Sequence, residues 1–372
     1  MSLLALAVAS TLGLGVARAL PGNEETADAQ ERTWQSFRTL KTDHFEIRYD
    51  TSEVVARTIA DRAEATLAAA LRFCESVGFE VKSLDARLHL WLFDQLADFT
   101  RYRNSVGLDE APRAGFYSPE KNLTTLVNTM SLPEVVRITE WIRQAKIELK
   151  EASTSPPGEQ GIRSEQDTLQ KRTETLQRHR DAIVDRFNHL VLQHEVAHQV
   201  FFNFGLHVRG ADNPQWLLEG LACQFEVSQG EEPRFPGNLN HLRLADLRGA
   251  LKIDSGITAC SDAVYEAALN SRRLASLADL ISNPKTLTDS QQNARYRYAQ
   301  AWGLVLYLSR KHRTSFADYL HRLSQRRPGE LISRQREVDE FTAAFGPPDK
   351  QHDLVWLDYV LRLTRGRSEI VR

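Results

Sequence analysis

The stretch NHLVLQHEVAHQVFFNFG, residues 188–205, places His194 and His198 four positions apart in a segment whose other residues predict a buried helix. Residues i and i+4 of an α-helix lie on one face, about 6 Å apart along the axis, so both imidazoles can converge on one ion. Glu195 is turned about 100° round the helix from His194, which directs its carboxylate beside that ion. Two core histidines with satisfied hydrogen bonds are the alternative, but burying both beside a glutamate would be costly without a compensating ion. The pattern therefore predicts two nitrogen ligands and a base next to a metal-bound water.

A second motif supplies a third ligand. The stretch NPQWLLEGLACQFE, residues 213–226, presents Glu219 in an apolar segment that is predicted to be helical from Trp216. Catalytic zinc has three protein ligands and one open position, and a carboxylate from a second helix can be the third ligand. The interval from His198 to Glu219 leaves room for a turn at Gly205 and an antiparallel return. Glu219 could instead cap its own helix, but its place after Trp216 puts it inside the first turns.

The two motifs carry a resemblance. HEVAHQ followed by PQWLLEGLA resembles the gluzincin group of zinc metallopeptidases, and within it the bacterial peptidase-MA-like families. Further similarity covers most of the chain, in the stretches HFEIRYD, AGFYSPEKNLTTLVN, YAQAWGLVLYL and FTAAFGPPD. The resemblance implies a zincin-like metallopeptidase fold, a bound Zn²⁺ and a peptide or protein substrate.

Carried over by position, the resemblance makes His194, His198 and Glu219 the zinc ligands and Glu195 the general base. Zinc lowers the pKa of a bound water from about 15.7 toward 7, and Glu195 would accept the proton and later pass it to the leaving amine.

The resemblance also implies an oxyanion donor and a substrate-binding strand. A tyrosine from the downstream helical region often stabilises the oxyanion in the family; Tyr298 matches best, and Tyr296 is the other candidate. An aromatic core role is the alternative for Tyr298. The family pairs substrate backbone with the strand before the active-site helix, so TTLVN, residues 124–128, would be an edge strand that receives an extended peptide.

The residues after Glu219 leave alternatives open. Some gluzincins have an acidic residue one turn beyond this ligand, where it supports a ligand histidine, but this chain has Cys223 there. Glu226 could serve instead, or it could be an exposed carboxylate. Cys223 as a fourth ligand would close the site and abolish catalysis.

Two other functions would use the same ligands. A catalytically silent zinc-binding or interaction module would keep the scaffold without turnover, although the intact Glu195 argues against it. Zinc-dependent hydrolysis of a non-peptide amide needs the same residues and is not separated from peptidase activity by the sequence.

The flanking segments predict an α+β fold, with a small mixed β-sheet N-terminal to the active-site helix and a mostly helical C-terminal half. Alternating apolar residues predict a strand at 44–50, and a long amphipathic helix follows from about 52 to 77. A second strand is expected at 86–93, and a hairpin pair at 113–118 and 122–128. From Tyr265 onward the pattern is helical.

Residues 131–187 predict a helical hairpin inserted before the active-site helix. A capping-box signature, SLPE, begins its first helix, and STSPPGEQG breaks that helix. The second helix repeats Leu169, Leu176, Ile183 and Leu190 at intervals of seven. The predicted organisation is thus a signal peptide at 1–19, a linker at 20–33 and one gluzincin-like catalytic domain at 34–372.

The beginning of the chain predicts export. An uncharged apolar run from Leu3 to Val16, followed by Ala17-Arg18-Ala19, resembles a signal peptide cleaved after Ala19. The run is shorter than the roughly 20 residues of a membrane-spanning helix. The protein is therefore expected in the periplasm, at the cell surface or outside the cell; a retained tail or short anchor is the alternative.

The composition limits the partners. A formal net charge of −2 gives no excess of base to attract nucleic acid or anionic lipid. No later segment is apolar for long enough to span a membrane stably. Three cysteines, an odd number, do not indicate a disulfide framework. The expected partner is a peptide or protein substrate.

Overall fold

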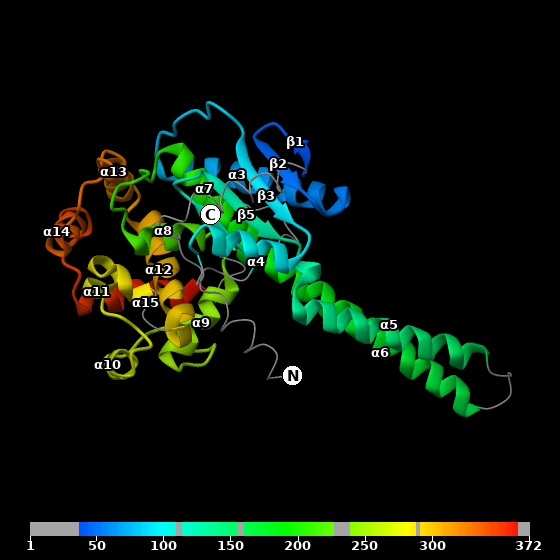
Figure 1. The fold of residues 1–372 in the computed structure, drawn as a ribbon. Coiled ribbons are helices and arrows are strands. Elements are labelled where there is room, and N and C mark those ends of the chain that lie inside the picture. Colours follow the sequence, from blue (N-terminus) through cyan, green and yellow to red (C-terminus); the bar gives the residue numbers. More distant parts are fainter. Residues whose placement is uncertain (1–36, 109–113, 155–159, 227–238, 288–290, 364–372) are drawn as a thin grey trace.

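The computed structural model describes residues 37–108, 114–154, 160–226, 239–287 and 291–363. A small mixed β-sheet precedes a largely helical C-terminal half, which confirms the predicted α+β class (Figure 1). The expected signal peptide, its cleavage point after Ala19 and the linker lie outside the described residues.

Five strands form the sheet in the order β1-β2-β3-β5-β4. β2, β3 and β5 are parallel to one another, whereas β1 and β4 pair antiparallel at the two edges. In β2, buried Phe45, Ile47 and Tyr49 alternate with half-exposed residues, as the period of two predicts. The bounds are β1 Arg38–Lys41, β2 Phe45–Tyr49, β3 Leu88–Phe93, β4 Gly115–Ser118 and β5 Leu123–Val127.

The strand expected to receive substrate is not at the sheet edge. β5 pairs with β3 on one side and with β4 on the other, so the prediction of an edge strand at 124–128 is wrong. β4 precedes β5 in the hairpin but lies outside it, and β4 is therefore the edge. A Cβ on Gly115 would lie 2.6 Å from Leu126 Cδ2 and 2.7 Å from Val191 Cγ1. Only glycine lets β4 approach the segment before the active-site helix this closely.

Helix α3 (Glu53–Val77) anchors the active-site helix to the sheet region. The Ser52 side chain caps its first turn, and Gly78 ends it in the left-handed conformation at φ 84°. The Phe73 ring of α3 packs edge-on against Phe201 of α7 (His194–Phe204), with centroids 5.9 Å apart. An additional helix that was not expected, α4 (Leu96–Ser105), packs beside β3 and β5.

Helices α5 (Pro133–Thr154) and α6 (Gln160–Phe187) form a hairpin that extends away from the body (Figure 1). A short 3₁₀ turn, η1 (Thr129–Ser131), precedes α5. A π-helical turn, η2 (Asn188–Gln193), joins α6 to α7. The active-site helix therefore begins where the second arm of the hairpin ends, across a type of turn that is frequent at functional sites.

The C-terminal half is built around α12 (Gln291–Lys311), which packs against α8, α9 and α15. Trp216, Trp302 and Trp356 are at most 1 % exposed and fill this core. Among the described residues, no helix combines the length and the apolar character needed to cross a bilayer. The other elements are α8 Gln215–Ala222, α9 His241–Leu251, α10 Asp262–Asn270, α11 Leu277–Ser282, η3 Pro284–Leu287, α13 Arg313–Leu323, α14 Arg334–Phe345 and α15 Lys350–Arg362.

Candidate metal centre

Helix α7 presents His194 and His198 on one buried face. Their side chains are one turn apart, and the two residues are 0 % and 1 % exposed. The ring centroids lie 4.7 Å apart at an interplanar angle of 79°. The i, i+4 spacing thus brings the two imidazoles together, as the helical geometry requires.

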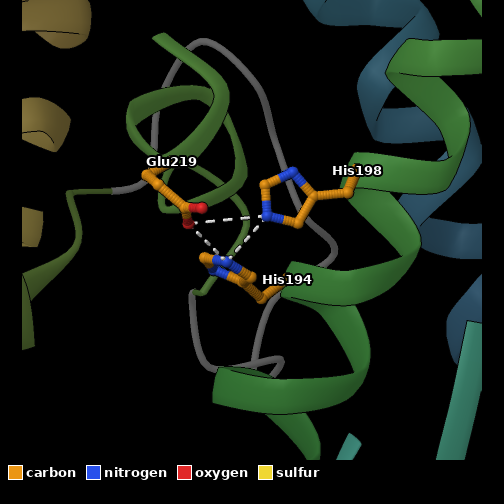
Figure 2. Close-up of side chains that lie close together, drawn as sticks. All are labelled: His194, His198 and Glu219. Atoms are coloured by element: carbon orange, nitrogen blue, oxygen red, sulfur yellow. Dashed lines mark hydrogen bonds and ion pairs between the residues drawn. The ribbon is translucent and has the colours of Figure 1, made fainter. Parts of the chain in front are cut away.

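Helix α8 brings Glu219 to the two histidines (Figure 2). Glu219 Oε2 lies 3.2 Å from His194 Nε2 and 3.5 Å from His198 Nε2, and the two Nε2 atoms are 3.0 Å apart. The neighbouring Gly220 allows α8 to touch α12, because a Cβ there would lie 2.5 Å from the carbonyl oxygen of Ala301. This close packing fixes the orientation of α8 and directs Glu219 toward α7.

His194, His198 and Glu219 could hold a metal ion. Tetrahedral ligands at about 2.0–2.1 Å from zinc lie about 3.3 Å from one another. The observed separations of 3.0, 3.2 and 3.5 Å surround this value. Glu219 Oε1 is buried and has no hydrogen-bond partner among the described residues, so its carboxylate is not fully satisfied by the protein.

The charges at the centre also suit a cation. Burial acts to raise the pKa of Glu219, but His198 and His194 outweigh it and lower the pKa. Glu219 is therefore a carboxylate beside two imidazoles, and Glu195 contributes a second acidic group to the same buried region. Burial acts to lower the pKa of His194, but Cys223, Glu219 and Glu226 outweigh it and raise the pKa. A proton on His194 thus balances Glu219, and a bound dication would take the place of that proton.

Glu195 lies next to the three possible ligands and is held by the edge strand. Its Oε2 accepts a hydrogen bond of 2.8 Å from the backbone N–H of Tyr117 in β4. Its Oε1 is buried without a partner in the described part of the chain. Burial raises the pKa of Glu195 to about 8, an effect that His194 opposes and Glu219 reinforces. One oxygen of Glu195 is thus anchored, and the other is left for a proton or a ligand.

The two tyrosine candidates differ in position. The Tyr298 ring in α12 lies 6.4 Å from the His194 ring, and its buried hydroxyl has no partner among the residues described. Burial and then the charge of Glu219 raise the pKa of Tyr298, so the phenol keeps its proton and can donate a hydrogen bond. The Tyr296 hydroxyl instead accepts a hydrogen bond from Arg295 at 2.6 Å, and its ring packs on Gly249. Tyr298 is thus the candidate whose ring lies beside His194.

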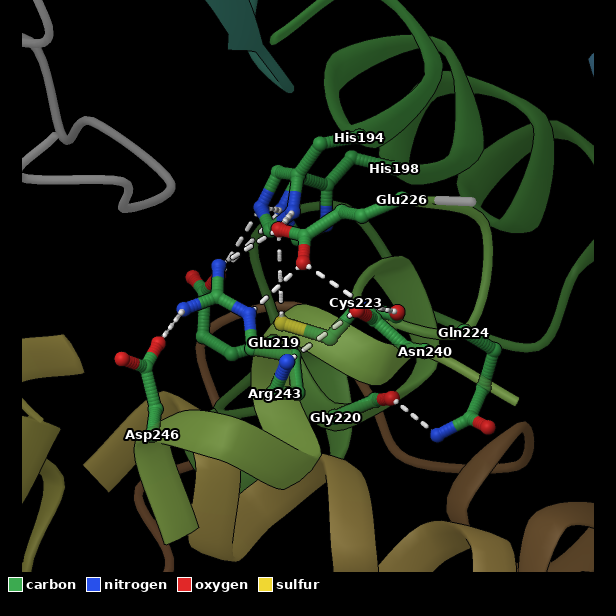
Figure 3. A network of polar contacts seen from close by, with 10 residues as sticks. All are labelled: His194, His198, Glu219, Gly220, Cys223, Gln224, Glu226, Asn240, Arg243 and Asp246. Atoms are coloured by element: carbon green, nitrogen blue, oxygen red, sulfur yellow. Dashed lines mark hydrogen bonds and ion pairs between the residues drawn. The ribbon is translucent and has the colours of Figure 1, made fainter. Parts of the chain in front are cut away.

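Glu226 contacts Nδ1 of His194, the ring nitrogen that does not face Glu219 and His198 (Figure 3). Its side chain is fully buried, and its Oε1 lies 2.9 Å from His194 Nδ1. Of the two interpretations of Glu226, an exposed carboxylate is therefore excluded. Burial acts to raise the pKa of Glu226, but Arg243 and His194 outweigh it and lower the pKa to about 2. A carboxylate that accepts from the second ring nitrogen of a ligand histidine fixes its tautomer and orientation.

Two further residues of this network were not predicted from the sequence. Arg243 in α9 and Asn240 at its N-terminus both donate hydrogen bonds to Glu226. The segment HLRLADLR resembles an ordinary helix with exposed arginines, and Arg243 is buried only because α9 docks beside the end of α8. No local pattern in the sequence distinguishes this arginine from an exposed one.

Cys223 does not complete the first ligand group. Its Sγ lies near Glu226, at 3.6 Å from Oε1, and belongs to a second group with His194 and Glu226 that could also hold a metal. Arg243 already donates to both Glu226 oxygens, which disfavours a cation at that second position. Burial raises the pKa of Cys223 to about 11, so the side chain is a thiol and a poor ligand.

Comparison with known families matches residues 190–330 to a family described as "Protein of unknown function (DUF1570)". The match covers less than half of the chain but includes the site residues from His194 to Tyr298. No curated protein matches the sequence. The family description assigns no activity, so the function is argued from the geometry of the site.

Proposed function

We propose that the protein is a zinc-dependent metallopeptidase, with His194, His198 and Glu219 as ligands and Glu195 as general base. The single observation that carries the proposal is the Oε1 of Glu195, which has no partner among the described residues and lies beside a three-residue group able to hold a metal. A site that only bound an ion would need the three ligands, but not a further carboxylic group with one oxygen left free. The gluzincin resemblance of both motifs supports the same assignment.

The roles follow from what each side chain can donate or accept. Zinc held by these ligands would lower the pKa of a water molecule and polarise the scissile carbonyl. Glu195 would take the proton of the attacking water at Oε1 while Oε2 stays bonded to the Tyr117 N–H, and would then deliver it to the leaving nitrogen. The Tyr298 hydroxyl would donate to the oxygen on which charge develops.

The proposed substrate is an extended peptide that adds to the outer edge of β4. In an antiparallel pair, alternate residues direct their N–H and C=O groups away from the partner strand. Tyr117 is such a residue, because its N–H meets Glu195. No described strand pairs with this edge of the sheet. A peptide that pairs with β4 by strand addition would therefore lie next to Glu195.

Export is a further part of the proposal, because it rests on the leader-like first residues. N-terminal sequencing of protein recovered from outside the cytoplasm tests it. The account expects a chain that begins at Leu20, and a recovered chain that still begins at Met1 would contradict cleavage after Ala19.

One observation favours a second candidate, a metal-binding module without turnover. His194, His198, Glu219 and Glu195 are each at most 1 % exposed, as ligands of a closed structural site would be. The Tyr298 hydroxyl, which has no partner in the described part of the chain, favours the hydrolase instead, because a closed site has no use for an unsatisfied donor beside its ligands.

Cleavage of a peptide library, followed by mass spectrometry, separates the candidates. The proposal predicts peptide cleavage that stops with a chelator and returns with Zn²⁺. Zinc binding without cleavage of any peptide or small amide would contradict the hydrolase and support the metal-binding module without turnover. If the protein hydrolyses only non-peptide amides, it is an amidohydrolase that uses the same ligands and not a peptidase.

A further inference from the structure

We infer that Arg243 is a positioning residue of the metal centre, which holds Glu226 against His194 and the ring of Tyr298 in place. The inference rests on the proposed metal centre but not on peptide cleavage. The sequence gives no sign of it, because Arg243 lies twenty-four positions beyond Glu219 on a separate helix.

Arg243 binds the Glu226 carboxylate through one edge of its guanidinium (Figure 3). Nε donates to Oε2 at 2.6 Å, and Nη2 donates to Oε1 at 2.6 Å. The Arg243 side chain is 5 % exposed and that of Glu226 is 0 % exposed, so the pair is shielded from water. Two parallel charge-assisted hydrogen bonds fix the plane of the carboxylate as well as its distance.

The position of Glu226 determines how His194 faces the ion. A guanidinium can only donate, so both Glu226 oxygens accept from Arg243. The contact of His194 Nδ1 with Oε1, at 2.9 Å, is then a donation from the ring to the carboxylate. With its proton on Nδ1, His194 would offer the lone pair of Nε2 to an ion held together with Glu219 and His198. Arg243 thus acts on the ligand through Glu226.

Contacts on its other sides hold Arg243 itself. The Asn240 side chain accepts a hydrogen bond from the Arg243 backbone N–H at 3.1 Å. Asn240 Nδ2 also donates to the Cys223 carbonyl at 2.9 Å and to Glu226 Oε2 at 3.2 Å. Asp246, one turn further along α9, lies 3.8 Å from Nη1. The start of α9 is therefore docked on the end of α8, and Arg243 has little freedom to move.

Arg243 also contacts the proposed oxyanion donor. Its guanidinium carbon lies 5.4 Å from the centre of the Tyr298 ring, within the range of a cation–π contact. The same side chain thus touches Tyr298 and reaches His194 through Glu226. Losing it would disturb the metal ligand and the candidate donor together.

The dissociation constant for Zn²⁺, measured by competition with a chromophoric chelator, tests the inference without any substrate. Arg243→Gln removes the charge and Arg243→Lys keeps it but loses the planar fork. We expect both variants to bind Zn²⁺ about 10- to 100-fold more weakly than the wild type, the range seen when support of a ligand histidine is lost. Visible spectra with Co²⁺ in place of Zn²⁺ should change as well, because the His194 ring would move relative to the ion.

Arg326 provides the matched control. Its side chain is 3 % exposed, is paired with Glu337 at 2.8 Å and Glu340 at 2.5 Å, and donates to the Asp212 carbonyl; none of these partners is a proposed ligand. Arg326→Gln should lower thermal stability and leave the Zn²⁺ affinity and the Co²⁺ spectrum unchanged. A variant that merely loosened the fold would therefore be recognised.

The outcomes separate the two proposals. Folded Arg243→Gln and Arg243→Lys variants with wild-type Zn²⁺ affinity would overturn the positioning role, even if the enzyme cleaved peptides. If Arg243→Gln does not fold, the Zn²⁺ affinity of Arg243→Lys alone tests the positioning role. A wild-type protein that binds Zn²⁺ but cleaves no peptide would overturn the peptidase and leave this inference standing, whereas a wild-type protein that binds no Zn²⁺ would overturn both.

Discussion

The Nε2 atoms of His194 and His198 lie 3.0 Å apart, and a carboxylate oxygen from a separate helix lies within 3.5 Å of both. A cation held among these three groups would be coordinated by both imidazole nitrogens and by the carboxylate. The fold positions all three groups by packing, since α7 is held by α3 and α8 by α12.

Removal of the proposed base should separate binding from turnover. Glu195→Gln keeps the size of the side chain and its contact with the Tyr117 N–H, but it cannot accept the proton. We expect retained Zn²⁺ and a kcat lowered by about 10²- to 10⁴-fold. Glu140→Gln on the hairpin, where the carboxylate pairs only with Arg143 among the described residues, is the control and should have wild-type kcat. Unchanged cleavage by Glu195→Gln would refute the role.

The tyrosines offer a matched pair of variants. Tyr298→Phe removes a buried hydroxyl that has no partner among the described residues, so stability and Zn²⁺ affinity should not fall. Its kcat should fall by about 10²- to 10³-fold if the hydroxyl stabilises the oxyanion. Tyr296→Phe loses only the contact with Arg295 and should keep its kcat. Steady-state kinetics of both variants checks this; equal rates would make Tyr298 a core residue.

The contact between α8 and α12 can be tested through one glycine. In Gly220→Ala the new Cβ would meet the Ala301 carbonyl oxygen at 2.5 Å, which forces α8 away from α12. We expect a loss of about 1–3 kcal/mol in the free energy of unfolding, with weaker Zn²⁺ binding because Glu219 moves too. Gly256→Ala meets nothing within 4 Å and should be neutral in denaturant unfolding. Gly220→Ala with wild-type stability would show that the contact is not tight.

Acid should destabilise the protein through His207. Burial lowers its pKa to about 3, with His198 adding to the effect, and the ring packs between Phe201 and Phe202. Between about pH 6.5 and 3, His207 is protonated in the unfolded chain but stays neutral in the folded chain. The free energy of unfolding therefore falls as the pH falls. The difference in free energy of unfolding between the wild type and His207→Leu should change by about 1.4 kcal/mol per pH unit there. A constant difference would show that His207 is protonated in the folded state.

Features set by local periodicity were predictable. The spacing of His194 and His198 defined one helix face, and the apolar context of Glu219 defined a second helix that returns to it. The long helix from about 52 to 77 matched α3 because its cap, its amphipathic pattern and the glycine that ends it are all local. These signals need no knowledge of distant contacts.

Features set by long-range packing were not predictable. The order of β4 and β5 in the sheet depends on which of the two pairs with β3. The sequence pattern of the hairpin is the same whether β4 or β5 is the inner strand. The support of His194 by Glu226 and Arg243 joins α7, the segment after α8 and α9, and each of the two supporting residues alone resembles a solvated charge. Sequence spacing therefore predicts ligands that lie on one helix. The residues that support them come from distant parts of the sequence, which only the folded chain brings together.

Zinc content by elemental analysis of purified wild type and Glu219→Ala tests the central claim most directly. The account predicts about one Zn²⁺ per wild-type chain and a large loss in Glu219→Ala, because two imidazoles alone hold zinc weakly. His89→Ala, which replaces an exposed histidine on β3, should keep the full content. A metal-free wild type, or a Glu219→Ala variant with undiminished zinc, would contradict a centre built from these three residues.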